Sequence, residues 1–313
     1  MSVLSAPHFH DEFAAIARLE NILWPSGPVC PHCGESHKSY EIKGKSARPG
    51  LRTCGKCRKQ FTVKIGTLFE DSHVPMYKWW QAVHLLVSSK KGISSHQLHR
   101  TLQVTYKTAW FMSHRIREAM RSGELAPMGI KGKIVEVDET FIGRKKGQPK
   151  RRGTGHKHAV LSLVERGGEV RSVHVSDIKT KTVLPIVNAN IDREARVMTD
   201  DALQYYEKLG HFAGHGVVNH SAGEYVRGDV HTNTVESYFA LFKRGMRGVY
   251  QHCSEKHLHR YLAEFDFRYN SRAALGVGDE QRAIKALKGV KGKRLTYRDS
   301  SPTSIGNQSE RDV

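Results

Sequence analysis

Two pairs of cysteines near the N-terminus limit the fold of this chain more than any other feature of its sequence. Cys30 and Cys33 form one C-x2-C pair, Cys54 and Cys57 form another, and 20 residues separate the two pairs. Four thiolates from two tight turns can surround one tetrahedral Zn²⁺ and leave no position open for chemistry. Redox-active or free thiols are the alternatives, but the spacing favours a structural zinc ribbon over residues 25–62 that depends on its metal to fold.

The fifth cysteine, Cys253, has three histidines close to it in the sequence. His252, His257 and His259 suggest a second metal site, but a helix with histidines on its surface is the better interpretation. The N-terminus lacks the basic start and long apolar run of a secretory signal. We therefore expect a cytoplasmic protein without a disulfide framework.

The charge of the chain indicates what kind of partner it binds. Lys and Arg number 50 against 31 acidic residues, which gives a formal net charge of +19. Such a charge indicates a polyanionic partner, such as nucleic acid. A membrane surface would also attract it, but no apolar run approaches the roughly 18 residues of a membrane span. We expect a DNA partner, no membrane segment and association with the nucleoid.

Helical patterns dominate residues 1–125. A short amphipathic helix over 11–24 precedes the ribbon, and three more helices follow between 76 and 120. The last two are separated by a short break at 104–107, like a helix-turn-helix. That arrangement would present three basic residues to a DNA groove, together with His114: Lys107, Arg115 and Arg117. An ordinary three-helix bundle is the alternative, and both interpretations can hold at once.

Alternating strand and helix patterns predict an α/β domain over residues 130–275. The strand patterns lie at 133–143, 158–166, 169–176, 195–200 and 216–220, with a Gly-Gly turn at 167–168 that makes a hairpin of the second and third. The helical patterns lie at 179–191, 201–210, 233–245 and 256–271. We therefore divide the chain into an N-terminal helix (1–24), the ribbon (25–62), a helical DNA-binding segment (63–125), this domain, and a basic, then disordered tail (276–313).

Three acidic residues stand where such a domain can bring them together. Asp138 follows one strand-like apolar run, Asp200 ends another, and Glu236 lies in the first turns of a helix. Lys243 follows Glu236 by seven residues, so the two share a helix face. Carboxylates from two strand ends and a helix can hold two divalent metals for in-line displacement at phosphorus.

For each of the three acids, the sequence also offers either a neighbouring acid that could be the ligand or a purely structural role. Glu136 shares a strand face with Asp138, Glu139 points the other way, and either could be surface. Asp201 competes with Asp200, and we prefer Asp200 because it is nearer the strand end. Asn233-x-x-Glu236 fits a capping box, in which Glu236 would only cap its helix.

A strongly basic loop lies close to these acids in the sequence. Residues 144–157 contain seven Lys and Arg residues and no acid, beginning six residues after Asp138. A basic run is usually a solvated face, but beside a phosphoryl-transfer site we expect it to contact phosphate. Six of its residues are candidates: Arg144, Lys145, Lys146, Lys150, Arg151 and Arg152.

The order and spacing of these motifs resemble a known family. Asp138, Asp200, Glu236 after 35 intervening residues and a base seven further on look like the DDE signature of transposases and retroviral integrases. The ribbon, helical segment and catalytic domain together resemble one group of bacterial insertion-sequence transposases. The resemblance implies an RNase H-like mixed sheet flanked by helices, Mg²⁺ or Mn²⁺ dependence, and cutting and joining at element ends. Because some relatives carry Asn at the third acidic position, Asn233 stays an auxiliary candidate.

Three functions remain as hypotheses. The first is a DDE transposase that acts as a homo-oligomer on terminal inverted repeats and target DNA. The second is a non-catalytic DNA-binding regulator that uses only the ribbon and the helix-turn-helix. The third is a metal-dependent nuclease without joining activity.

Overall fold

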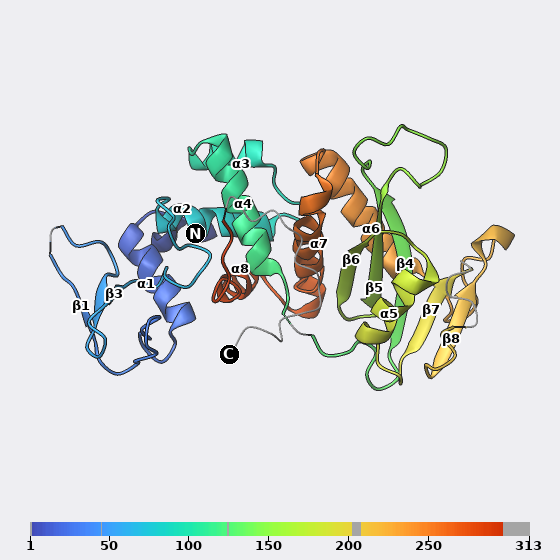
Figure 1. Cartoon of the computed structure of the whole chain (residues 1–313), viewed down its shortest axis with the longest axis horizontal. Coiled ribbons are helices and arrows are strands. Elements are labelled where there is room, and N and C mark those ends of the chain that lie inside the picture. The colour runs from blue at the N-terminus through green and yellow to red at the C-terminus, as the bar shows by residue number, and fades with distance from the viewer. Residues whose placement is uncertain (1, 45, 124, 202–207, 297–313) are drawn as a thin grey trace.

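The computed structural model of the chain describes residues 2–44, 46–123, 125–201 and 208–296. They form an elongated molecule in which a small sheet, a group of helices and a larger sheet follow one another along the long axis (Figure 1). Among these residues, no helix combines the length and apolarity needed to cross a membrane.

The small sheet carries the N-terminal cysteines. Strands β1 (Ser39–Glu41), β2 (Arg52–Cys54) and β3 (Gln60–Phe61) are antiparallel in the order β1-β2-β3. Its core consists of Cys30, Cys54 and Phe61, with a few partly buried neighbours. So small an apolar core cannot stabilise a fold by burial alone, which agrees with a ribbon that depends on its metal.

The helical region forms around a single apolar core. The short helices η1 (Val3–Ser5) and η2 (Pro7–Phe9) lead into α1 (Glu12–Leu23), and α2 (Met76–Ser88), α3 (Ser95–Leu102) and α4 (Tyr106–Met120) follow the ribbon. Side-chain caps begin three of these helices: Asp11, Ser94 and Thr105 each accept a backbone N–H of the following turn.

The segment after residue 276 corrects the predicted division of the chain. Following η5 (Ala273–Leu275), residues Asp279–Lys288 form a further helix, α8, whose Ala283, Ala286 and Leu287 lie in the same core as α1 and α2. The basic segment is therefore not a tail at this point. The residues that we expect to be disordered, 300–313, lie outside the described part of the chain.

The larger sheet has five strands in the order β6-β5-β4-β7-β8. The central strand β4 is antiparallel to β5, which pairs with β6 in the predicted hairpin, and parallel to β7, which is parallel to β8. The strands span Ile134–Ile142 (β4), His158–Glu165 (β5), Val170–Val175 (β6), Arg196–Asp200 (β7) and Gly214–Val218 (β8). The helix predicted over 201–210 falls mainly on residues 202–207, which are outside the described residues.

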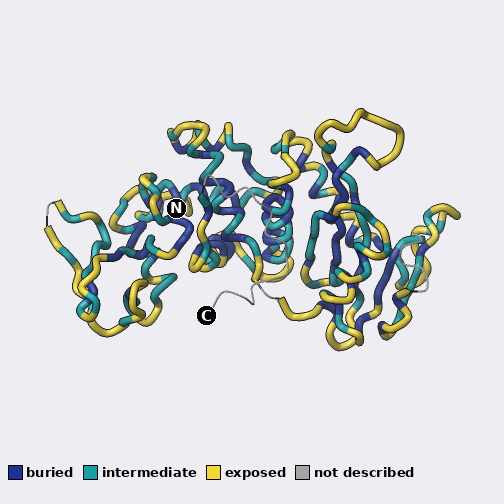
Figure 2. Tube along the Cα trace, in the orientation of Figure 1, coloured by how far each residue is buried: buried dark blue, intermediate teal, exposed yellow. Residues whose placement is uncertain are grey.

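Helices cover both faces of this sheet. On one face, Val135 and Val137 of β4 pack with α5 (Thr180–Asn190). On the other face, β4 and β5 pack with α6 (Asn233–Gly245) and α7 (Glu255–Tyr269). The turn η3 (His220–Ala222) follows β8, and the π-helical turn η4 (Met246–Tyr250) extends α6. The buried backbone runs through the sheet and the central helices, whereas the connections are exposed (Figure 2).

The two large parts meet where α7 packs against α4. Arg117 of α4 donates through Nε to Glu264 Oε2 of α7 at 2.6 Å, and the two side chains are only 1% and 0% exposed. A charged pair without contact to water therefore joins the helical region to the sheet domain.

Candidate active site and zinc ribbon

The four cysteine sulfurs form one compact group. All four Sγ atoms lie within 4.8 Å of one another, with Cys30 to Cys57 at 3.7 Å and Cys33 to Cys54 at 3.6 Å. A tetrahedral site with Zn–S bonds of about 2.3 Å places its sulfurs about 3.8 Å apart. Without a metal the four thiols affect one another: the Cys57 amide lowers the pKa of Cys54 to about 7, whereas the pKa of Cys33 is raised to about 12 by burial and the neighbouring thiols. The donor set and its dimensions therefore fit one Zn²⁺.

The sheet register brings Asp138 and Asp200 to the same level. The parallel pairing of β4 and β7 ends with Glu136 opposite Met198. Asp138 and Asp200 each lie two residues after this pair. They are therefore level with each other on the two strands, and their side chains point to the same face of the sheet. Val135 and Val137 point to the α5 side, which places the two acids on the α6 side. Successive side chains of a strand point to opposite faces, so Asp201 would point away from Asp138. This supports Asp200 as the partner of Asp138.

The electrostatics of Asp138 show that the three acids influence one another. Burial and, after it, the negative charges of Asp200, Glu139 and Glu236 raise the pKa of Asp138 to about 8. The backbone N–H of Glu139 donates to Asp138 Oδ1 at 2.7 Å and opposes this shift. Carboxylates that repel one another in this way are stabilised by a bound cation.

Glu236 lies near the start of α6 but does not cap it, so the competing explanation for this residue fails. The helix begins at Asn233 after Thr232, and the Thr232 hydroxyl donates to Glu236 Oε1 at 2.9 Å. His220 Nε2 lies 3.4 Å from the same oxygen. The capping box between Asn233 and Glu236 is therefore wrong, and about half of the Glu236 side chain remains exposed.

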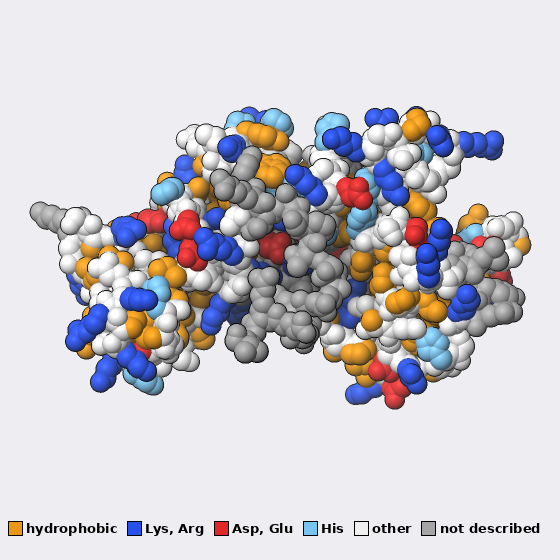
Figure 3. All heavy atoms as spheres, viewed as in Figure 1, with side chains coloured by type: hydrophobic (Ala, Val, Ile, Leu, Met, Phe, Trp, Pro, Cys, Tyr) orange, Lys and Arg blue, Asp and Glu red, His pale blue; other side chains and the backbone are white. Residues whose placement is uncertain are grey.

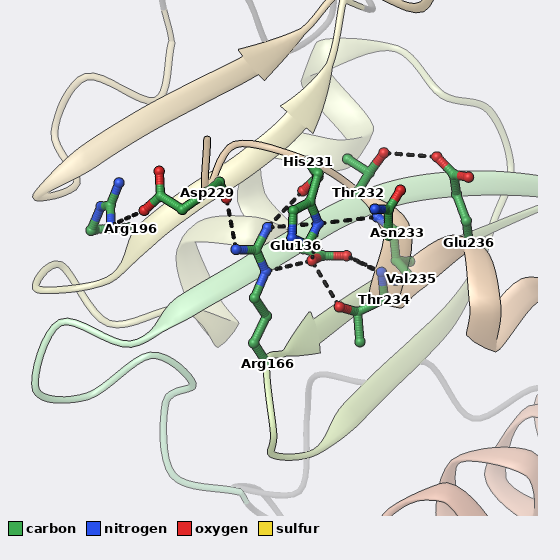
Figure 4. A network of polar contacts seen from close by, with 10 residues as sticks. All are labelled: Glu136, Arg166, Arg196, Asp229, His231, Thr232, Asn233, Thr234, Val235 and Glu236. Carbon is green, nitrogen blue, oxygen red and sulfur yellow. Dashed lines mark hydrogen bonds and ion pairs between the residues drawn. The ribbon is translucent and has the colours of Figure 1, made fainter. Parts of the chain in front are cut away.

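The cap of α6 comes from a different acid, Glu136 of β4. The carboxylate of Glu136 accepts the backbone N–H groups of Thr234 at 2.8 Å and Val235 at 2.9 Å (Figure 4). Arg166 donates to it through Nε at 2.6 Å. Glu136 has no exposed surface, so the suggestion that it could be a surface residue is wrong.

This buried acid positions the segment that precedes α6. Arg166, besides binding Glu136, donates to the carbonyls of Asp229 and His231 (Figure 4). The first turn of α6 is thus held on β4 two residues before Asp138, which places Glu236 at the acidic end of the sheet. An acidic residue within an apolar strand was the sequence signal that Glu136 could be buried. Its partners could not be predicted, because they come from distant segments of the chain.

Lys243 also lies within electrostatic reach of Asp138. Partial burial and the neighbouring charge of Arg247 lower the pKa of Lys243, whereas Asp138 raises it. The Lys243 Nζ atom lies 6.0 Å from the centre of the Phe239 ring. The structure therefore brings all four predicted residues to one region.

The acids are less tightly grouped than the cysteines. Among the described residues, ligand atoms come within 4.8 Å of one another in two groups only, the four cysteines and the set His158, His174 and Glu255. The alternative of a metal site at Cys253, which the sequence disfavours, is not one of them.

Comparison with known proteins shows the relationship of the chain. Residues 129–270 match the family model of the ISXO2-like transposase domain, and residues 10–60 match that of the transposase zinc-ribbon domain. The chain is 31% identical over 282 residues to an uncharacterised protein in the transposable element ISH50 of Halobacterium salinarum, covering 83% of this chain and 91% of that protein. The chain belongs to the ISXO2-like transposase family.

This assignment confirms the predicted insertion-sequence transposase with an N-terminal zinc ribbon. A chain of the simian T-cell lymphotropic virus intasome in complex with PP2A regulatory subunit B56 gamma also aligns with this transposase. Its identity is 14%, the alignment covers 55% of this chain and 67% of that chain, and the TM-score is 0.28. A likeness at this level carries no argument.

Removing one ribbon ligand of this transposase is expected to release one equivalent of zinc. Cys54→Ser should unfold residues 25–62, because their small core depends on the metal, and leave the larger sheet intact. Metal analysis with far-UV circular dichroism measures both effects. Cys253→Ser is the matched control, since Cys253 lies outside the cluster. Full zinc content in Cys54→Ser would contradict the site.

The helix pair of the transposase departs from the predicted groove-facing arrangement. Arg117 and His114 are each 1% exposed, because both lie where α4 packs against α7. The prediction that these two residues face DNA is therefore wrong. Arg115 is half-buried and donates to the Glu70 carbonyl, whereas Lys107 is exposed at the start of α4.

The basic loop of the transposase connects β4 to β5 and projects from the molecule (Figure 1). Lys and Arg side chains extend into solvent in this region (Figure 3). Lys145 is partly held, with its amide bonded to the His156 carbonyl and its Nζ to the Ser176 carbonyl at 3.4 Å. The other five predicted residues are exposed: Arg144, Lys146, Lys150, Arg151 and Arg152.

Proposed function

We propose that this transposase cleaves the ends of its element and joins them to target DNA by DDE-type phosphoryl transfer. The observation that carries the proposal is the placement of Asp138 and Asp200 at one level of adjacent parallel strands. The bonds from Glu136 to the start of α6 and the influence of the Glu236 charge on Asp138 support Glu236 as the third acid. The strand order, with three antiparallel strands followed by two parallel ones, also supports an RNase H-like domain.

The donor set fits two Mg²⁺ or Mn²⁺ ions. Asp138, Asp200 and Glu236 would supply carboxylate oxygens, the ligands that these hard cations prefer. When bound, such ions lower the pKa of an attacking water and stabilise the leaving oxygen. The Lys243 ammonium would hold a phosphate oxygen next to these carboxylates. Asn233 remains an auxiliary candidate because it begins the same helix.

The basic loop supports DNA as the substrate. The exposed Lys and Arg side chains of the loop come directly after β4, the strand that carries Asp138. DNA bound to the loop would therefore lie near the acidic residues. The formal charge of +19 supplies further attraction to phosphate. We expect the transposase to act on terminal inverted repeats as a homo-oligomer, since two ends must be brought together.

Contact between the loop and DNA should appear in the salt dependence of binding. Arg151→Ala together with Arg152→Ala removes two phosphate contacts, so the log–log salt slope should fall by about 1.8. Fluorescence anisotropy on element-end DNA at several salt concentrations measures this slope. The pair Lys285→Ala and Lys288→Ala, on the exposed side of α8, removes the same charge and should leave the slope unchanged. Equal slopes for both double variants would show that the loop does not contact the DNA.

The joining reaction separates this function from its two rivals. Purified protein, labelled element ends, target plasmid and Mg²⁺ should give strand-joined products, and none with EDTA. Cleavage without joining would indicate a nuclease, and binding without cleavage would indicate a regulator.

A further inference from the structure

A second cluster of metal-ligand side chains lies at the base of the basic loop. His158 is the first residue of β5, His174 lies near the end of β6, and Glu255 is the first residue of α7. His174 pairs with Val160, so the two histidines are diagonal neighbours on the sheet face that α7 covers. Three elements distant in the sequence therefore meet at this point.

The atoms of this cluster are close enough to share one ion. His158 Nδ1 lies 3.9 Å from Glu255 Oε2, and His174 Nε2 lies 3.9 Å from Glu255 Oε1. One ligand atom from each residue falls within 4.8 Å of the other two. In a tetrahedral zinc site with bonds of about 2.0–2.1 Å, ligand atoms lie about 3.3 Å apart. Glu255 is exposed, so its side chain can shift and shorten both of these histidine–glutamate distances.

The two imidazoles have nitrogen atoms that lack partners. His158 Nδ1 and His174 Nε2 are both buried without a hydrogen bond, and the His158 side chain is only 5% exposed. A buried nitrogen without a hydrogen-bond partner is unfavourable. These are the same two atoms that face Glu255, so one ion between the three residues would satisfy both.

We propose that His158, His174 and Glu255 bind a second Zn²⁺, separate from the ribbon and from the acidic residues. Two imidazoles and a carboxylate form a ligand set that Zn²⁺ accepts, with water in the fourth position. The ion would fasten the start of α7 to the sheet where the basic loop enters β5. It would stabilise the base of the loop that we propose to contact DNA; the metal site itself does not depend on the DDE assignment.

Zinc titration of the full-length protein with its ribbon site filled tests this proposal. Wild type should take up one further equivalent of Zn²⁺, and the amides at the start of α7 should then exchange more slowly with deuterium. His174→Ala should lose this equivalent. Glu255→Gln, at an exposed position that tolerates the change, should weaken it by roughly tenfold or more. His252→Ala, an exposed histidine outside the cluster, should match wild type.

The same variants distinguish zinc bound at this cluster from zinc bound at the ribbon or at the acidic residues. Zinc at either place would persist in His174→Ala and in Glu255→Gln. The proposal is overturned if wild type takes up no further zinc, or if either variant binds the further equivalent as tightly as wild type does.

Discussion

Asp138→Asn, Asp200→Asn and Glu236→Gln should each fold and bind element ends but lose strand cleavage and joining. Each change removes one negative charge from a group that a cation must hold together, while nearly preserving side-chain volume. Because a catalytic metal contributes several kcal/mol to the transition state, the rate should fall by on the order of a hundredfold or more. Single-turnover cleavage of labelled ends in Mg²⁺ measures the rate, and anisotropy measures binding.

Two neighbouring substitutions make the residue assignment specific. Asp201→Asn should keep most of the activity, because its side chain has the opposite parity to Asp200 at the end of β7. Asn233→Ala tests whether Asn233 or Glu236 supplies the third metal ligand. Normal turnover of Glu236→Gln together with loss of activity in Asn233→Ala would move the third ligand to Asn233.

Glu264→Ala is expected to have the largest effect on stability. The Glu264 carboxylate binds Arg117 of α4 and Arg268 of its own helix, and it accepts the Tyr250 hydroxyl. Its removal leaves two buried guanidinium groups without their shared anion, which costs about 3–5 kcal/mol. The thermal midpoint should fall by on the order of 10 °C.

An exposed ion pair supplies the control for this prediction. Glu280→Ala removes the partner of Arg18 at the surface and should cost less than about 1 kcal/mol. Equal midpoints for Glu264→Ala and Glu280→Ala would show that the α4–α7 junction does not depend on the buried pair.

The pH dependence of stability at this junction has a defined sign. Burial alone would raise the pKa of Glu264, but Arg268 and Arg117 lower it below its ordinary value. A carboxylate with a lowered folded-state pKa contributes its stability above the ordinary value and loses it as the pH falls through the folded-state pKa. Wild type should therefore lose stability more steeply than Glu264→Gln on acidification below about pH 4.5.

Local signals in the sequence were sufficient for much of this protein. Cysteine spacing identified the ribbon, because a metal knuckle needs only two close ligands and a turn. Alternating apolar residues predicted the strands of the larger sheet. Asp200 ends β7 as expected, whereas Asp138 lies in the middle of β4 (Ile134–Ile142) and not at a strand end. The three-acid pattern with Lys243 also identified the family, which the comparisons confirm. The cysteine pairs and the strand patterns depend on residues close together in the chain, whereas the three acids lie far apart and were linked only through the resemblance to a family.

The tertiary structure decided which charged residues are buried. Arg117 and Glu136 look like surface residues in the sequence, since charged side chains are rarely buried without a partner. Their partners, Glu264 and the start of α6, lie 147 and about 98 residues away. The return of α8 to the N-terminal core and the meeting of His158, His174 and Glu255 have the same origin. The local pattern of apolar and polar residues does not predict contacts that form only when distant elements pack together. These contacts are seen only in the folded chain.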